Sequence, residues 1–231
     1  MRTSALAAAV AAGILTLWSG TATAVGQSAC RDLAGTVDPD GTCRVHATAT
    51  AYTLDFSFPD AYPDQQALVG YLTQTRDGFI NVSDMPGSRD LPYVLDAKGT
   101  AYRSGIFPGG TQSVVFEVYQ NVGGAHPQTW FKAFNYNLAA RTPITYDTLF
   151  VPGSDPLGVI YPIVQADLQR QTGVQQAISP VNGMDPSHYQ NFALTDDTVI
   201  FFFGQGELLA DAAGATQASV PRAALATLLA V

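Results

Sequence analysis

Apolar and polar residues alternate strongly in the stretch VHATATAYTLDFSFP, which runs from Val45 to Pro59. Successive side chains of a strand point to opposite faces, so the alternation favours an extended chain with one buried face. Four large apolar side chains then share that face: Tyr52, Leu54, Phe56 and Phe58. This stretch is predicted to be a half-buried strand.

The period of the apolar positions becomes helical in AYPDQQALVGYLTQTRDGFINV, residues 61–82. Pro63 suits the first turn of a helix, because its fixed φ matches the helix and its missing N–H needs no partner there. The side chains that recur at helical spacing are Ala67, Leu68, Tyr71, Leu72, Thr75 and Phe79. A first helix is therefore predicted here.

A second helix is predicted over residues 154–173, SDPLGVIYPIVQADLQRQTG. Ser154 or Asp155 can cap its start, and Gly173 can end it in a left-handed conformation. Pro162 falls inside the segment, so a kink or a late start is expected.

The remaining patterned segments predict strands. Three strands are expected at residues 93–104, 111–122 and 128–136, the first two separated by IFPGG. NFALTDDTVIFFFG predicts a hairpin with Asp196 and Asp197 at its tip, and a last strand near 217–220 precedes a short helix begun by Pro221. Runs of strands interrupted by two helices predict an α+β fold: a mostly antiparallel sheet with the two helices packed on it.

The N-terminus has the layout of a secretory signal peptide. Arg2 precedes an Ala/Leu-rich stretch, and Ala22-Thr23-Ala24 fits a cleavage site. The apolar run is shorter than the roughly 20 residues that a spanning helix needs, so a retained anchor is the weaker alternative. Residues 1–24 are predicted to be removed, which leaves residues 25–231 as a single secreted domain.

The chain has two cysteines, Cys30 and Cys43. In the oxidising compartment that the leader indicates, they are expected to pair. A loop of this size stabilises by about 3 kcal/mol in the chain-entropy model. A redox-active pair is the alternative, but the spacing is not C-x-x-C.

Charge excludes several classes of partner. The formal net charge is −8, or −9 once Arg2 is removed, and Lys98 and Lys132 are the sole lysines. Without a basic cluster the chain is not expected to bind nucleic acid, and anionic membrane surfaces are disfavoured. The segment Asp38–Gly41 (DPDG) lacks the rest of a calcium loop, so neither a metal nor a cofactor is predicted.

His126 lies in GGAHP and is the candidate for catalysis. Exposed N–H groups of Gly123 and Gly124 beside a titratable imidazole could form an oxyanion site with a general base. The alternative is that the two glycines only allow a turn, which Pro127 ends.

No other residue completes a catalytic motif. His188 is assigned to a turn begun by Asp185-Pro186, and His46 to a packed or surface position on a strand. The chain lacks G-x-S-x-G, the motif that presents the serine of α/β-hydrolases, and nothing selects one serine over another. The nucleophile is therefore unassigned.

Long motifs along the mature chain resemble the secreted mycobacterial immunogenic-protein family. They are YPDQQAL, TQTRDGF, GGAHP, FNYNLAARTPITYDTLF, YPIVQADL, DPSHYQNFALTDD and FFFGQGELL. GGAHP and the C-terminal half are also distantly similar to the extracellular domain of lysozyme-sensing anti-sigma factors. The resemblance implies an α+β fold with a β-grasp-like part, made from an N-terminal module at about 25–140 and a C-terminal domain at about 141–231.

The same resemblance implies two functions. TWFKAFNYNLA and YPDQQAL look closest to a branch described as exported, cell-wall-associated esterases. The expected function is therefore an exported carboxylesterase acting on acyl esters, with His126 as base. The alternative is a non-catalytic secreted protein that binds a host or cell-wall protein. Peripheral membrane association is a third and weaker hypothesis.

Overall fold

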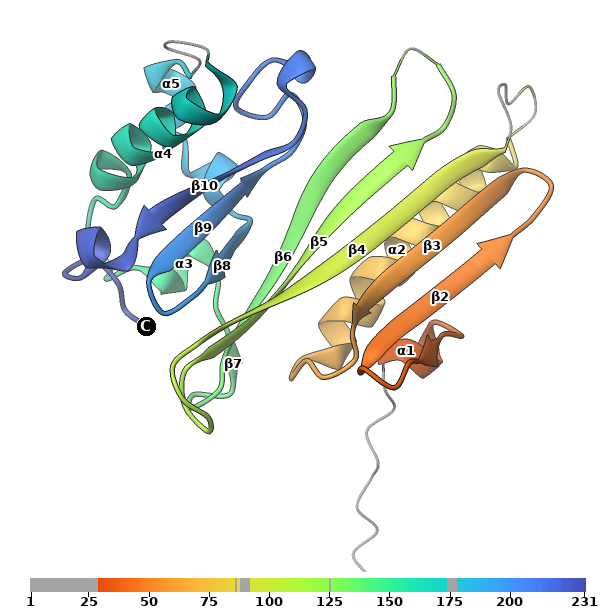
Figure 1. Ribbon diagram of the computed structural model, residues 1–231, viewed down its shortest axis with the longest axis horizontal. Helices are drawn as coiled ribbons and strands as arrows, with labels where there is room; N and C mark the ends of the chain where they lie inside the picture. Colours follow the sequence, from red (N-terminus) through yellow and green to blue (C-terminus); the bar gives the residue numbers. More distant parts are fainter. Residues whose placement is uncertain (1–28, 86, 88–91, 125, 174–177) are drawn as a thin grey trace, which may run out of the picture.

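The computed structural model describes residues 29–231 except 86, 88–91, 125 and 174–177, and it contains two sheets, each with one long helix (Figure 1). The predicted α+β fold is confirmed. The main sheet has seven strands whose spatial order follows the sequence: β1 (Thr36–Val37), β2 (Thr42–Thr48), β3 (Tyr52–Pro59), β4 (Tyr93–Ser104), β5 (Thr111–Asn121), β6 (Gln128–Asn137) and β7 (Thr142–Pro143). Neighbouring strands are antiparallel except β3 and β4, which are parallel and are joined across the sheet by α2 (Gln65–Ser83).

The predicted strands at 93–104, 111–122 and 128–136 are confirmed as β4, β5 and β6. The single strand predicted over residues 45–59 is wrong: β2 and β3 are two strands of a hairpin, and Ala49 N donates to Tyr52 O (2.9 Å) in its turn. The buried side chains sit at odd positions in β2 and at even positions in β3, so the phase of the alternation changes at the turn. No glycine, proline or asparagine marks this reversal.

The first helix, α2, begins later than predicted. Asp64 caps it by accepting from the Ala67 N–H (3.1 Å), so Pro63 precedes the helix instead of opening it. Three residues of the predicted apolar set are buried against the sheet, namely Leu68, Leu72 and Phe79. The disulfide Cys30–Cys43 is formed and ties the short helix α1 (Ala29–Asp32) to β2.

The second sheet has the strand order β10 (Thr216–Pro221), β9 (Thr198–Phe203), β8 (Phe192–Leu194), all antiparallel. It confirms the predicted hairpin and last strand. The second predicted helix is α4 (Leu157–Thr172), which ends at Gly173 with φ 72° and contains Pro162. It packs on this second sheet and not on the main one (Figure 1). The two helices therefore cover different sheets, and not one sheet as predicted. The short elements are α3 (Tyr146–Leu149), α5 (Pro180–Gly183), η1 (Pro186–Tyr189), η2 (Asp211–Ala213) and η3 (Arg222–Leu225).

Strand β9 is buried on both faces. Phe201 and Phe203 join the core under α4, while Phe202 points the other way and packs with Val115 of β5 and Ala193 of β8. The second sheet therefore covers part of the side of the main sheet opposite α2. We call this part the covered face; its side chains are Tyr102, Ser113, Val115, Phe131, Ala133 and Asn135.

The same side of the main sheet continues across β2, β3 and β4 without a second sheet over it. We call this part the open face; its side chains are Arg44, His46, Thr48, Asp55, Ser57, Asp96 and Lys98. These positions alternate with buried ones such as Val45, Leu54 and Ala97, which face α2. Within the described residues, no helix is both long and apolar enough to cross a membrane.

Candidate functional site

His46 lies on the open face between a hydroxyl and a carboxylate. Its Nδ1 is 2.7 Å from Asp55 Oδ1, and its Nε2 is 3.0 Å from Thr48 Oγ1. The strand pairing builds this arrangement, because His46 stands directly opposite Asp55 in the β2–β3 ladder and Thr48 is two residues further along the same face. All three side chains are accessible to solvent.

The two contacts of His46 assign a role to each ring nitrogen. An ionised Asp55 accepts a hydrogen bond from Nδ1–H, which leaves the Nε2 lone pair free to accept the Thr48 hydroxyl proton. This is the order of groups in a catalytic triad: a nucleophile, a base, and a carboxylate that orients the base. We call Thr48, His46 and Asp55 the relay.

A cleft of about 230 Å³ adjoins the relay, and Arg44, His46, Asp55, Asp96 and Lys98 contribute to its walls. Asp96 stands beside Asp55 in the parallel β3–β4 pair. Partial burial, and secondly the negative charge of Asp55, raise the pKa of Asp96. Lys98 supplies a positive charge at the same cleft, whereas Arg44 pairs with Asp38.

His126, the predicted base, lies at the end of the β5–β6 hairpin. It is exposed, and it makes no hydrogen bond or ion pair with another residue in the described part of the chain. Gly123 and Gly124 have φ values of 74° and 93°, so they do form the turn that glycine allows. The Gly123 N–H already donates to Asn121 Oδ1 (3.0 Å). The catalytic role of His126 stays a prediction, and Ala125 lies outside the described residues.

His188 lies on η1, within the turn that Asp185-Pro186 predicts. Its Nδ1 is 3.7 Å from Glu207 Oε1, and Glu207 Oε2 accepts from the Gly204 N–H (2.7 Å). Burial raises the pKa of Glu207, an effect that the Gly204 bond and the nearby His188 oppose. No described hydroxyl bonds to the second ring nitrogen of His188, so this pair lacks a nucleophile. Among the described residues, no group of three or more His, Cys, Asp or Glu side chains is arranged to hold a metal ion.

Comparisons with known proteins identify the family. The chain is 58% identical over 196 residues to a Mycobacterium tuberculosis protein named Esterase Rv3036c, covering 85% of this chain and 86% of the relative. It is 49% identical over 221 residues to the Immunogenic proteins MPT64 of M. tuberculosis and MPB64 of M. bovis, covering 96% of each chain. The chain belongs to the Rv3036c–MPT64 family.

Broader comparisons agree with this fold. Residues 147–223 match the family model described as Protein of unknown function (DUF3298). A DUF3298 family protein from Pseudomonas aeruginosa aligns with a TM-score of 0.58 at 13% identity, over 84% of this chain and 95% of the other. One from Bacteroides fragilis aligns with a TM-score of 0.53 at 12% identity, over 85% and 95%. At such low identity these structures show the fold alone, and the similarity to anti-sigma factors stays a prediction.

In this member of the Rv3036c–MPT64 family, the sequence pattern did contain a signal from which the relay could have been predicted. A single strand over residues 45–59 places His46 on the apolar side with Leu54, which suggests a packed histidine. The phase change between Ala47 and Tyr52 is the signal for a hairpin. Once the chain reverses there, His46 and Asp55 fall opposite each other on the polar side.

Proposed function

We propose that this chain is an exported carboxylic ester hydrolase that uses the relay for acyl transfer. His46 is the base, Asp55 positions it, and the Thr48 hydroxyl is the nucleophile. The observation that carries the proposal is the hydrogen-bonding of both His46 ring nitrogens, one to a carboxylate and one to a hydroxyl. The name of the 58% identical relative, Esterase Rv3036c, supports the same reaction class.

The proposed chemistry has two steps. Thr48 Oγ1 attacks the ester carbonyl carbon as its proton moves to His46 Nε2, and the same proton then goes to the departing alcohol. Water next attacks the acyl-threonine ester, again giving its proton to Nε2, and the acid leaves as Thr48 regains a proton. Asp55 stays ionised throughout and stabilises the imidazolium.

Two backbone N–H groups that follow Thr48 in the sequence are candidate donors for the developing oxyanion. The turn between β2 and β3 contains the N–H groups of Thr50 and Ala51, which donate to no other residue in the described ranges. N–H groups fixed in a turn stabilise negative charge on a tetrahedral intermediate without having to reorient during the reaction.

The test is hydrolysis of a chain-length series of p-nitrophenyl esters by the purified protein and its variants. We expect His46→Asn and Thr48→Val to lower kcat/KM at least ~100-fold, the usual lower contribution of a positioned base. Asp55→Asn should also lower it, and Thr48→Ser should retain turnover. An organophosphonate probe should label Thr48, as mass spectrometry of the digested protein would show.

The matched controls are His126→Ala and His188→Ala, which remove a histidine elsewhere and should leave turnover unchanged. If His126→Ala abolished turnover while His46→Asn kept it, the base would be His126, as its sequence context predicts. If a variant that combines His46→Asn, Thr48→Val and His126→Ala still hydrolyses the esters, neither His46 nor His126 is the base.

One observation favours a second candidate function, binding of a host or cell-wall protein. The relay lies on a wide exposed sheet face, with His46 and Asp55 side chains 65% and 58% exposed, instead of in a deep cavity. Relatives 49% identical to the chain are named immunogenic proteins. If the esters are hydrolysed no faster than with a protein blank, the binding function is tested next. The purified protein is used to pull down host or cell-wall proteins, and the open-face variant His46→Glu is the control.

The proposed location is extracellular, with attachment to the cell wall as a finer proposal. The predicted signal peptide, residues 1–24, lies outside the described residues. A disulfide between Cys30 and Cys43 suits an oxidising compartment. N-terminal sequencing of the protein from culture medium should begin at Val25, and an intact leader there would contradict the proposal.

A further inference from the structure

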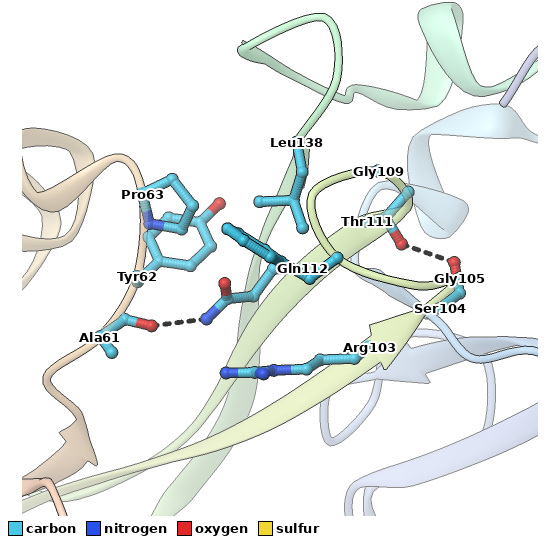
Figure 2. A pocket seen from close by; sticks show the side chains of 11 residues that line it. Ala61, Tyr62, Pro63, Arg103, Ser104, Gly105, Gly109, Thr111, Gln112 and Leu138 are labelled. Atoms are coloured by element: carbon cyan, nitrogen blue, oxygen red, sulfur yellow. Dashed lines mark hydrogen bonds between the residues drawn. The ribbon is translucent and has the colours of Figure 1, made fainter.

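A second cleft lies on the α2 side of the main sheet, under the turn between β4 and β5 (Figure 2). Its volume is about 410 Å³, within the range of roughly 300–1,000 Å³ that small-molecule pockets occupy. Arg103 of β4 and Gln112 of β5 pair across the ladder and therefore share one side of the sheet. Gln112 lies two and four residues before the core residues Val114 and Phe116 on β5, so it shares their face, and that face lies toward α2.

The walls of this cleft are mostly apolar. Tyr62 and Pro63, just before α2, form one wall, and Leu138 and Phe107 close other sides. Tyr62 is 5% exposed, and its ring makes edge contacts with the rings of Phe134 and Tyr136. Phe107, in contrast, keeps 81% of its surface in solvent, so the turn holds a large apolar side chain at the cleft without a protein partner to cover it.

Several polar groups of the cleft are already hydrogen-bonded within the protein. The Gln112 side chain donates to Ala61 O, and the hydroxyls of Ser104 and Thr111 bond to each other at 2.8 Å (Figure 2). Arg103 makes no hydrogen bond or ion pair with another residue in the described ranges. In a chain of net charge −8, this guanidinium is a positive charge beside apolar walls.

We propose that this cleft binds a long-chain carboxylate, such as a free fatty acid. The hydrocarbon chain would lie against Tyr62, Leu138 and Phe107, with the carboxylate on Arg103. A guanidinium fork matches the two oxygens of a carboxylate, and apolar walls favour the chain because it leaves water. No relay residue lines this cleft, so the proposal does not depend on the proposed esterase.

The test is titration of the full-length protein with decanoate, followed by amide chemical shifts in two-dimensional NMR. We expect saturable shifts at Tyr62, Phe107 and Gln112, and much weaker binding of acetate, which has the charge without the chain. Arg103→Gln should weaken decanoate binding up to ~5-fold, the effect of one exposed ion pair. It should leave binding of the uncharged 1-decanol unchanged.

Two matched controls separate this site from general adsorption. Ile106→Ser removes a neighbouring side chain that is 89% exposed and does not line the cleft, so it should bind normally, whereas Phe107→Ser should bind more weakly. Arg141→Gln removes an equal charge outside the cleft and should have no effect. His46→Asn should also bind decanoate normally.

Shifts that do not saturate, or that spread over the open face, would overturn the proposal. Equal weakening by Arg103→Gln and Arg141→Gln would overturn it too, because it would indicate attraction by overall charge.

Discussion

The open face and the covered face belong to one side of one sheet, yet their side chains differ in solvent exposure. On the open face, the His46 and Asp55 side chains are 65% and 58% exposed. On the covered face, Ser113, Val115 and Asn135 are no more than 4% exposed. Alternation along a strand assigns each side chain to one of the two faces of the sheet. It does not predict which region of a face a second sheet will bury. The second sheet therefore decides which positions maintain stability and which remain available to a ligand.

Polar residues show the consequence most clearly. The buried Asn135 Nδ2 donates to Phe192 O (2.8 Å), and Asn191 Oδ1 accepts from the Ala133 N–H (3.0 Å). These bonds hold the two sheets together, since a buried polar group without a partner is costly. On the open face the polar groups of the relay bond to one another and stay exposed, so they remain accessible to a ligand.

Phe202→Ala is expected to have the largest effect on stability. The Phe202 ring is buried between the sheets, 5.3 Å from the ring centroid of Phe131 and 5.9 Å from that of Tyr102. Removing it should lower the free energy of unfolding by ~3–5 kcal/mol, the cost of a large buried aromatic side chain. Chemical denaturation would measure the loss, and Phe202→Leu should lose less.

The open-face counterpart sharpens the comparison. His46→Asn should change the free energy of unfolding by less than ~0.5 kcal/mol, as is usual for exposed positions. A loss as large as that of Phe202→Ala would show that the open face is also part of the folding core, contrary to the distinction drawn from exposure.

Asn135→Ala should have an intermediate effect. It removes the donor to Phe192 O, but it also removes Asn135 Oδ1, a buried oxygen that has no hydrogen-bond partner among the described residues. The two changes oppose each other, so a loss of about 1 kcal/mol is expected. Ser57→Ala on the open face is the control, and an equal loss there would break the comparison.

Much of the fold could be predicted because local signals were strong. The bounds of β4, β5 and β6 follow from alternation and from IFPGG, a segment that cannot continue a strand. The turn between β2 and β3 was missed because Ala49-Thr50-Ala51 has β-compatible residues and no turn former. Because the turn was missed, the pairing of His46 with Asp55 was missed too, and so was the relay.

The second sheet and the Arg103 cleft could not be read from local sequence. Phe201–Phe203 predicts a strand buried on both faces, but not that Phe202 meets Val115. The cleft depends on Ala61 and Tyr62 reaching Gln112, a contact between positions 51 residues apart. Such contacts are set by how the elements pack, which periodicity within one element does not encode.

Asp96→Asn is expected to have the smallest effect, and its sign depends on pH. Although Asp96 lies at the surface of the open face, partial burial and the charge of Asp55 raise the pKa of its carboxyl. Its ionised form is therefore less favourable in the folded chain than in the unfolded one. The resulting penalty is absent below the ordinary aspartate pKa and grows as pH rises through the folded-state value. Asn, which does not ionise, avoids the penalty.

Asp96→Asn should thus raise the free energy of unfolding at neutral pH by no more than ~0.5 kcal/mol, the usual range for surface positions, and should change it little at pH ~3. Denaturant unfolding at both pH values measures the difference. A loss of stability at neutral pH that disappears in acid would have the opposite sign and would mean that Asp96 is held ionised by a positive neighbour. Lys98, on the same cleft, would then be the side chain to replace next.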